Sequence, residues 1–131
     1  GKNPLTGSND DRIGPRFSSM TEPYDLRLLD RAERSALEGG ITAPRCVFAG
    51  VGASPTPAES RYLANTGADI YGFGIISDTI TAQHVGLPVI AVADLIDRRI
   101  PEGSVSLDTA KADTAALSEN MLGMVERLVR S

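Results

Sequence analysis

The sequence predicts an α/β fold with a mainly parallel central sheet flanked by helices. Three observations carry this prediction. Strand-like and helix-like segments alternate along the middle of the chain, the strand-like segments are apolar throughout, and the helix-like segments start and stop at capping residues. A strand followed by a helix and a second strand implies a parallel pair joined by a crossover. Strands that are apolar on both faces need cover on both faces.

The alternation consists of five segments. In chain order they are a strand at Cys46–Gly52, a helix at Thr56–Gly67, a strand at Ile70–Ile75, a helix at Ser77–Gly86 and a strand at Pro88–Ile96. Thr56, with Pro57 and Glu59 after it, predicts a capping box at the start of the first of these helices. Ser77 is expected to cap the second helix, and Gly86 is expected to end it.

Two further helices and a long loop complete the chain. Helical spacing of apolar residues predicts a helix over Thr21–Leu37, capped by Thr21 and ended by Gly39 and Gly40, and another from about Ser106 to Val129. The last helix is expected to bury one stripe, which comprises Leu107, Ala110, Thr114, Leu117, Met121, Met124, Val125 and Leu128. Residues 1–20 are rich in turn formers, and a loop of that length is uncommon unless it has a function or packs on another part of the protein.

The sheet is incomplete in this chain. Its 131 residues suffice for one domain. Three strands are few for a buried parallel sheet, because a typical sheet has about 5–6. We therefore expect further strands from a part of the protein outside this sequence.

Composition excludes several classes of function. The net charge is −4 without a basic cluster, which argues against nucleic acid and against an anionic membrane as partners. No apolar run approaches the roughly 20 residues that span a bilayer. Cys46 and His84 are the only residues of their types, so a zinc site and an internal disulfide are not expected. A reducing cytoplasm is the expected location.

Candidate site residues lie at the predicted strand ends, where ligands bind in parallel sheets. Gly52–Thr56 is either a binding loop or a plain strand-to-helix turn. Phe73 could stack under a ring, although a core position is the commoner role for phenylalanine. Asp94 and Asp97 flank the end of an apolar run, where an unpartnered carboxylate is costly. This favours a site role for Asp97, whereas Asp94 could instead cap a loop. His84 is expected to be structural, with its imidazole bonded to a carbonyl at a helix end.

Three segments together resemble the purine nucleoside phosphorylase family, which includes the methylthioadenosine phosphorylases. They are NPLTGSNDDRIGPRFSSMTEPYD (residues 3–25), GASPTPAESRYLANTGADIYGFG (52–74) and ISDTITAQHVGLPVIAVADLID (76–97). The resemblance covers the C-terminal half of a family subunit. It implies a three-layer phosphorylase-type fold, with residues 1–20 as an interface and active-site loop and residues 21–131 as part of the α/β domain.

The family's reaction is phosphorolysis, in which phosphate attacks C1′ of a purine nucleoside and releases the free base and a pentose 1-phosphate. The resemblance therefore implies a purine nucleoside and phosphate as substrates, with no metal or organic cofactor. It also implies a homotrimer or hexamer-type assembly and a complementary N-terminal half, in the same or a separate polypeptide. That half would contain the family's phosphate-binding serine, histidine and arginine.

The resemblance assigns roles to three residues of this chain. Asp97 lies where enzymes for 6-oxopurines have an asparagine at the purine N7, whereas the methylthioadenosine branch has aspartate, which favours adenine-type bases. Phe73 replaces the methionine beneath the sugar. Ile13 matches the aromatic that reaches into a neighbouring subunit's site.

Other family positions are altered. Within the binding loop that includes Ala53 and Ser54, Pro55 replaces the phenylalanine that stacks on the purine, and the glutamate after it is deleted. Gly74 replaces a phosphate-binding serine or threonine, with Ile75 beside it. Asp113 falls where a histidine lies near the 5′-hydroxyl. The alternative function is therefore a catalytically eroded family member that acts as a ligand-binding or structural subunit.

Overall fold

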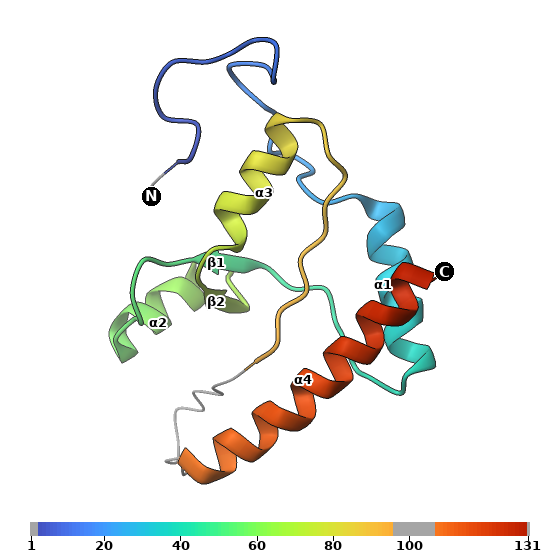
Figure 1. Ribbon diagram of the computed structural model, residues 1–131. Helices are drawn as coiled ribbons and strands as arrows, with labels where there is room; N and C mark the ends of the chain where they lie inside the picture. Colours follow the sequence, from blue (N-terminus) through green and yellow to red (C-terminus); the bar gives the residue numbers. More distant parts are fainter. Residues whose placement is uncertain (1–2, 96–106, 131) are drawn as a thin grey trace. The chain divides into compact units, whose positions relative to one another are not determined.

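The computed structural model describes residues 3–95 and 107–130, the latter without side chains for residues 107–118. Its elements, shown in Figure 1, are α1 (Leu26–Glu38), β1 (Phe48–Gly50), α2 (Pro57–Asn65), β2 (Ile70–Gly72), α3 (Ile75–His84) and α4 (Leu107–Arg130). The chain forms two compact units. Unit 1 comprises residues 1–28 and 44–91, and unit 2 comprises residues 29–43 and 92–131.

Unit 1 contains the predicted β-α-β arrangement, which confirms the α/β fold class. β1 and β2 run parallel, with Phe48 opposite Ile70 and Gly50 opposite Gly72. Both strands are shorter than predicted, although single hydrogen bonds extend the pairing at each end. The Val47 carbonyl accepts from Asp69 N–H (2.9 Å), and Val51 N–H donates to the Gly72 carbonyl (2.9 Å).

The start of α2 confirms the predicted capping box. Thr56 is its N-cap, and its Oγ1 accepts from Glu59 N–H at 3.3 Å. The Glu59 carboxylate in return accepts from Thr56 N–H at 2.7 Å. These bonds satisfy amide groups that a helix start would otherwise leave unpaired.

The start of α3 differs from the prediction. The helix begins at Ile75 rather than after Ser77, with Gly74 as an N-cap that makes no side-chain bond. Gly74 has φ of +82°, a conformation that only glycine adopts readily. The turn at Gly74 therefore sets the helix start, and Ser77 already lies in its first turn. The predicted end is confirmed, because Leu87 N–H donates to the Ala82 carbonyl (2.9 Å) around Gly86.

The start of α1 also differs from the prediction. Residues 21–25 are irregular, and Asp25 rather than Thr21 caps the helix, with its carboxylate accepting from Leu28 N–H at 3.0 Å. The backbone N–H of Asp25 donates to the Val89 carbonyl at 3.0 Å. This contact directs the Asp25 amide outside any helical ladder, which explains why the helix begins later.

The predicted third strand is wrong within the described residues. Residues 87–95 are extended without forming a strand, and the sheet of the described chain contains β1 and β2 alone. An apolar run becomes a strand only where a neighbour offers a hydrogen-bonding edge. Large side chains also remain exposed, and none in the described part of the chain is fully buried. Both observations agree with a sheet that continues beyond these residues.

Unit 2 is held together by the contact between α1 and α4, the predicted C-terminal helix. Small residues of α1, namely Ala32, Ser35 and Ala36, are buried together with Met124 of α4. The Ser35 hydroxyl donates to the Met124 carbonyl at 2.7 Å. Of the expected α4 stripe, Met121 and Leu128 are half-buried and Val125 is exposed. The other members of the stripe lie outside the described side chains.

Candidate active site

The candidate active site lies at the edge of the sheet where β1 and β2 end. Because the strands are parallel and in register, their carboxyl ends lie at the same edge. The hydrogen bond from Val51 N–H to the Gly72 carbonyl fixes the first residue beyond β1 beside the last residue of β2. The loop before α2 and the turn at Phe73 and Gly74 therefore leave from neighbouring positions, where α/β proteins bind ligands.

A hollow of about 310 Å³ opens beside the first of these segments. Its lining comprises Val51, Gly52, Ala53, Ser54, Pro55, Glu59, Tyr62 and Leu63. Ala53, Ser54 and Pro55 were predicted as site residues, and the structure places them around this one hollow. Their binding roles stay predictions.

Besides Val51, three lining residues were not predicted, namely Glu59, Tyr62 and Leu63 of α2. Their spacing is the signal that could have found them. Residues three and four positions apart lie on one face of a helix, and α2 starts directly after the predicted binding loop. Glu59 was interpreted only as a cap.

Glu59 is held rigidly within the hollow. Thr56 N–H and Thr56 Oγ1 both donate to the same oxygen, Oε2, at 2.7 and 2.8 Å. These bonds lower the pKa of Glu59, with the backbone bond as the larger cause. The carboxylate is therefore ionised and oriented at neutral pH.

Pro55 and Phe73 differ in how far they are buried. Pro55 is buried, so it forms part of the wall of the hollow rather than a free stacking surface. Phe73 is 59% exposed among the described residues, and both interpretations of its role stay predictions.

Gly74 has a structural reason to lack a side chain. A serine or threonine at its φ of +82° would be strained. A serine or threonine is therefore disfavoured at this turn. Ile75, the next residue, is the first of α3 and is half-buried.

The N-terminal loop packs on the end of α3. A Cβ at Gly14 would collide with the carbonyl oxygen of His84, so glycine is required for this approach. His84 is buried, which agrees with a structural role. The expected carbonyl partner is not found, since its Nδ1 makes no hydrogen bond with any described residue. Ile13, beside Gly14, is 59% exposed and therefore available for a neighbouring molecule.

The geometry of the hollow does not test the three predicted carboxylates. Asp94 is half-buried in unit 2, whereas the hollow belongs to unit 1. Asp97 lies outside the described residues. Asp113 belongs to α4, in the part whose side chains are not described. Their predicted roles are untouched by the geometry.

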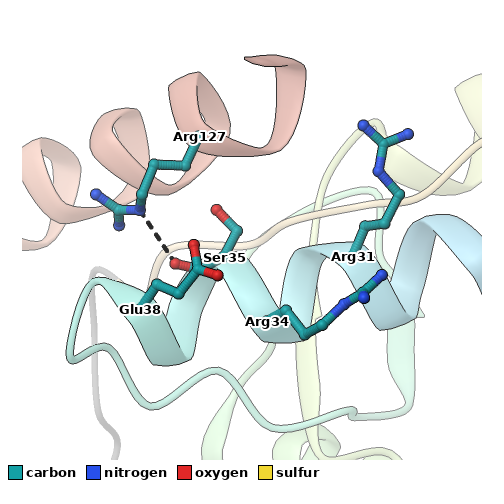
Figure 2. A pocket seen from close by; sticks show the side chains of 5 residues that line it. All are labelled: Arg31, Arg34, Ser35, Glu38 and Arg127. Carbon is teal, nitrogen blue, oxygen red and sulfur yellow. Dashed lines mark hydrogen bonds between the residues drawn. The ribbon is translucent and has the colours of Figure 1, made fainter. Parts of the chain in front are cut away.

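A second hollow, of about 260 Å³, lies in unit 2 and is lined by Arg31, Arg34, Ser35, Glu38 and Arg127. Figure 2 shows the guanidinium groups of Arg31 and Arg127 directed away from each other. Arg127 Nε donates to the Ser35 carbonyl (3.1 Å), and Arg31 Nη2 donates to the Leu128 carbonyl (2.9 Å). Both arginines thus join α1 to α4, and their donors do not converge on one anion.

The part of the chain that the structure describes lacks two further kinds of feature. No group of three or more acidic, histidine or cysteine side chains could hold a metal ion there. No helix in those ranges is long and apolar enough to cross a membrane.

Comparison with known proteins identifies the class to which this α/β fold belongs. The chain belongs to the phosphorylase superfamily, whose family model matches residues 1–130. Within that superfamily, it is similar to purine nucleoside phosphorylase 1 of Bacillus subtilis (strain 168), with 32% identity over 133 residues, 98% of this chain and 49% of the relative. This confirms the resemblance to purine nucleoside phosphorylases.

Solved structures agree with the sequence comparison. Isoform 2 of the purine nucleoside phosphorylase from Schistosoma mansoni, in complex with cytosine and ribose-1-phosphate, superposes with a TM-score of 0.83 at 27% identity. The match covers 96% of this chain and 47% of that one. A Schistosoma mansoni purine nucleoside phosphorylase in complex with adenosine gives a TM-score of 0.74 at 27% identity, covering 95% of this chain and 48% of the other. The chain thus spans about half the length of the relatives it matches.

Proposed function

We propose that this chain forms part of a purine nucleoside phosphorylase, which uses phosphate to cleave the N-glycosidic bond of a purine nucleoside. The observation that carries the proposal is the family match over residues 1–130, together with a hollow at the strand edge where such a fold binds ligands. A structural relative that holds ribose-1-phosphate supports the same reaction, because this compound is a product of phosphorolysis.

The complete site needs residues from outside this chain. The phosphate-binding groups would belong to the complementary half of the domain, and phosphate would be the co-substrate, with no organic cofactor or metal. Ile13 would reach a neighbouring subunit of a trimer. A cytoplasmic enzyme of purine salvage fits this assignment.

Asp97 is the proposed acid at the base. A protonated carboxyl can donate to N7 of the leaving purine, where negative charge grows in the transition state, while its other oxygen accepts from a 6-amino group. Asp113 would lie near the 5′-hydroxyl, Asp94 at the rim of the site, and Phe73 beneath the sugar. This set favours adenosine or methylthioadenosine over inosine.

The test is phosphorolysis by this chain assembled with the rest of its domain, using adenosine, inosine and methylthioadenosine with and without phosphate. We expect phosphate-dependent release of the free base. Asp97→Ala should lower kcat/KM by about a hundredfold or more, as loss of a transition-state donor does. Asp97→Asn should shift the preference towards inosine. No turnover of any of the three nucleosides would contradict the proposal.

Two observations favour the alternative of an eroded, non-catalytic member. Pro55 is buried in the wall of the hollow, and Gly74 adopts a conformation that disfavours a serine or threonine. Binding of a purine by the assembled protein, with no turnover in the phosphorolysis assay, would establish this second function.

A further inference from the structure

The hollow beside the β1 end has the composition of a site for a flat, partly polar ring. Most of its lining is small or apolar, and Glu59 supplies its one carboxylate. Tyr62 supplies its one aromatic ring. Its volume of about 310 Å³ falls within the range of small-molecule sites.

Glu59 is prepared to accept a hydrogen bond from a ligand. Both bonds from Thr56 fall on Oε2, and the other oxygen, Oε1, has no hydrogen-bond partner among the described residues. The capping box thus fixes the side chain with one acceptor oxygen available. A fixed carboxylate binds an N–H group more strongly than a mobile one, because little rotamer entropy is lost on binding.

Tyr62 is placed to stack on the same ligand. It lies three residues after Glu59, on the same face of α2, and lines the same hollow. Its side chain is 68% exposed, although tyrosine usually buries most of its ring. An accessible ring beside an oriented carboxylate is what recognition of a nucleobase requires.

We propose that Glu59 and Tyr62 form the base-binding pair of this protein. Glu59 Oε1 accepts a hydrogen bond from a ring N–H or the exocyclic amino group of a purine, and Tyr62 stacks on the ring. Both residues belong to α2, so they can compensate for the glutamate missing from the loop and for the ring that Pro55 lacks. This proposal rests on the proposed function, since it names how the same site holds its base.

The variants follow from the hydrogen bonds. Glu59→Gln keeps the capping box, because glutamine serves at that position too. It replaces one acceptor oxygen of the carboxylate by an NH2 group, which donates instead. Tyr62→Leu removes the ring, whereas Tyr62→Phe keeps it. Arg61→Gln is the matched control, because Arg61 lies on α2, is exposed and does not line the hollow.

The experiment measures the dissociation constants of adenine and hypoxanthine by calorimetry, on this chain assembled with the rest of its domain. Glu59→Gln should weaken binding of the preferred base about tenfold, and Tyr62→Leu about threefold to tenfold. Tyr62→Phe keeps the ring and should weaken binding less than Tyr62→Leu does, whereas Arg61→Gln should bind as the unchanged protein does. Thermal unfolding of Glu59→Gln should stay within about one degree.

The outcomes separate this proposal from the proposed function. If the protein binds a purine and both Glu59→Gln and Tyr62→Leu bind it within about twofold of the unchanged protein, the base-binding pair is wrong even if phosphorolysis occurs. Absence of purine binding by the unchanged protein would also overturn it. If the variants weaken binding while no nucleoside is cleaved, the pair stands and only the enzymatic proposal fails.

Discussion

The two units of this chain hold their elements together in different ways. Unit 1, which contains the candidate site, has three close contacts that leave no room for a side chain. Gly50 lets Ile76 of α3 approach β1, Gly72 lies against the Phe48 ring, and Gly14 lies against the end of α3. Unit 2 packs through small buried side chains and through side-chain bonds to backbone carbonyls, with Ser35 at its centre.

The difference predicts how much stability is lost when one contact is removed or crowded. A hydrogen bond between helices contributes about 1 kcal/mol, and its loss leaves the backbones in place. A glycine contact has no such reserve, because an added Cβ must displace what it meets. We therefore expect the site-bearing unit to be more sensitive to small additions than unit 2 is to small deletions.

The largest effect is expected at Gly14. In Gly14→Ala the new methyl group meets the backbone carbonyl of His84, which cannot move without distorting the end of α3. We expect a loss of about 3 kcal/mol in the free energy of unfolding, at the upper end of overpacking effects. Urea denaturation measures this loss, and limited proteolysis of the N-terminal loop reports its displacement.

Gly39→Ala is the matched control from unit 2. There the new methyl group would meet the Arg127 guanidinium, the far end of a flexible side chain that can swing away. We expect a loss of about 1 kcal/mol or less, roughly that of the bond from Arg127 to Ser35. Equal losses for the two variants would break the comparison between the units.

The next effect is expected where α3 meets β1. A Cβ at Gly50 would lie 2.6 Å from Cγ1 of Ile76, so Gly50→Ala should destabilise the protein by about 2 kcal/mol. Chemical denaturation checks this value. In an Ile76→Ala background the same substitution should cost clearly less, because the 2.6 Å contact is removed and only the contact with the Cβ of residue 76, at 3.2 Å, remains. An undiminished cost in that background would place the strain elsewhere.

A smaller effect is expected at the centre of unit 2. Ser35→Ala removes the 2.7 Å bond to the Met124 carbonyl in a buried position, and should lower the unfolding free energy by about 1 kcal/mol. Ser77→Ala, at an exposed position of α3, should change stability by less than about 0.5 kcal/mol. A Ser35→Ala effect no larger than the Ser77→Ala effect would show that the contact between the helices does not depend on this bond.

The sequence predicted those elements whose signals are local. The capping box at Thr56 and Glu59 and the helix stop at Gly86 were correct, because each is decided within a few residues. The caps at Thr21 and Ser77 were wrong because distant contacts decided instead. The bond from Asp25 to Val89 and the turn at Gly74 could not be recognised from nearby residues.

The third strand and the site show the same limit. The apolar run from Pro88 predicted a buried strand, but its described residues are half-buried or exposed. A strand needs a partner edge that this chain does not supply among its described residues. At the site, the loop at Ala53–Pro55 was found because strand ends bind ligands. Glu59 and Tyr62 were missed because a helix cap and an exposed aromatic look structural until a hollow is seen between them.

The smallest effect is expected on the pH dependence of stability, through Glu59 of unit 1. The hydrogen bonds from Thr56 lower the pKa of Glu59 in the folded protein, so this carboxyl is more acidic folded than unfolded. Its contribution to stability is therefore fully present above its ordinary pKa and is lost as the pH falls through the lowered value.

Glu59→Gln keeps the cap and cannot titrate. Between about pH 6 and about pH 3, we expect the urea midpoint of the unchanged protein to fall further than that of the variant. Because Glu59 is fully exposed, the difference should be small and should shrink further in high salt. Parallel pH profiles would show that the capping box acts through geometry alone, and that the charge of Glu59 is free to serve a ligand.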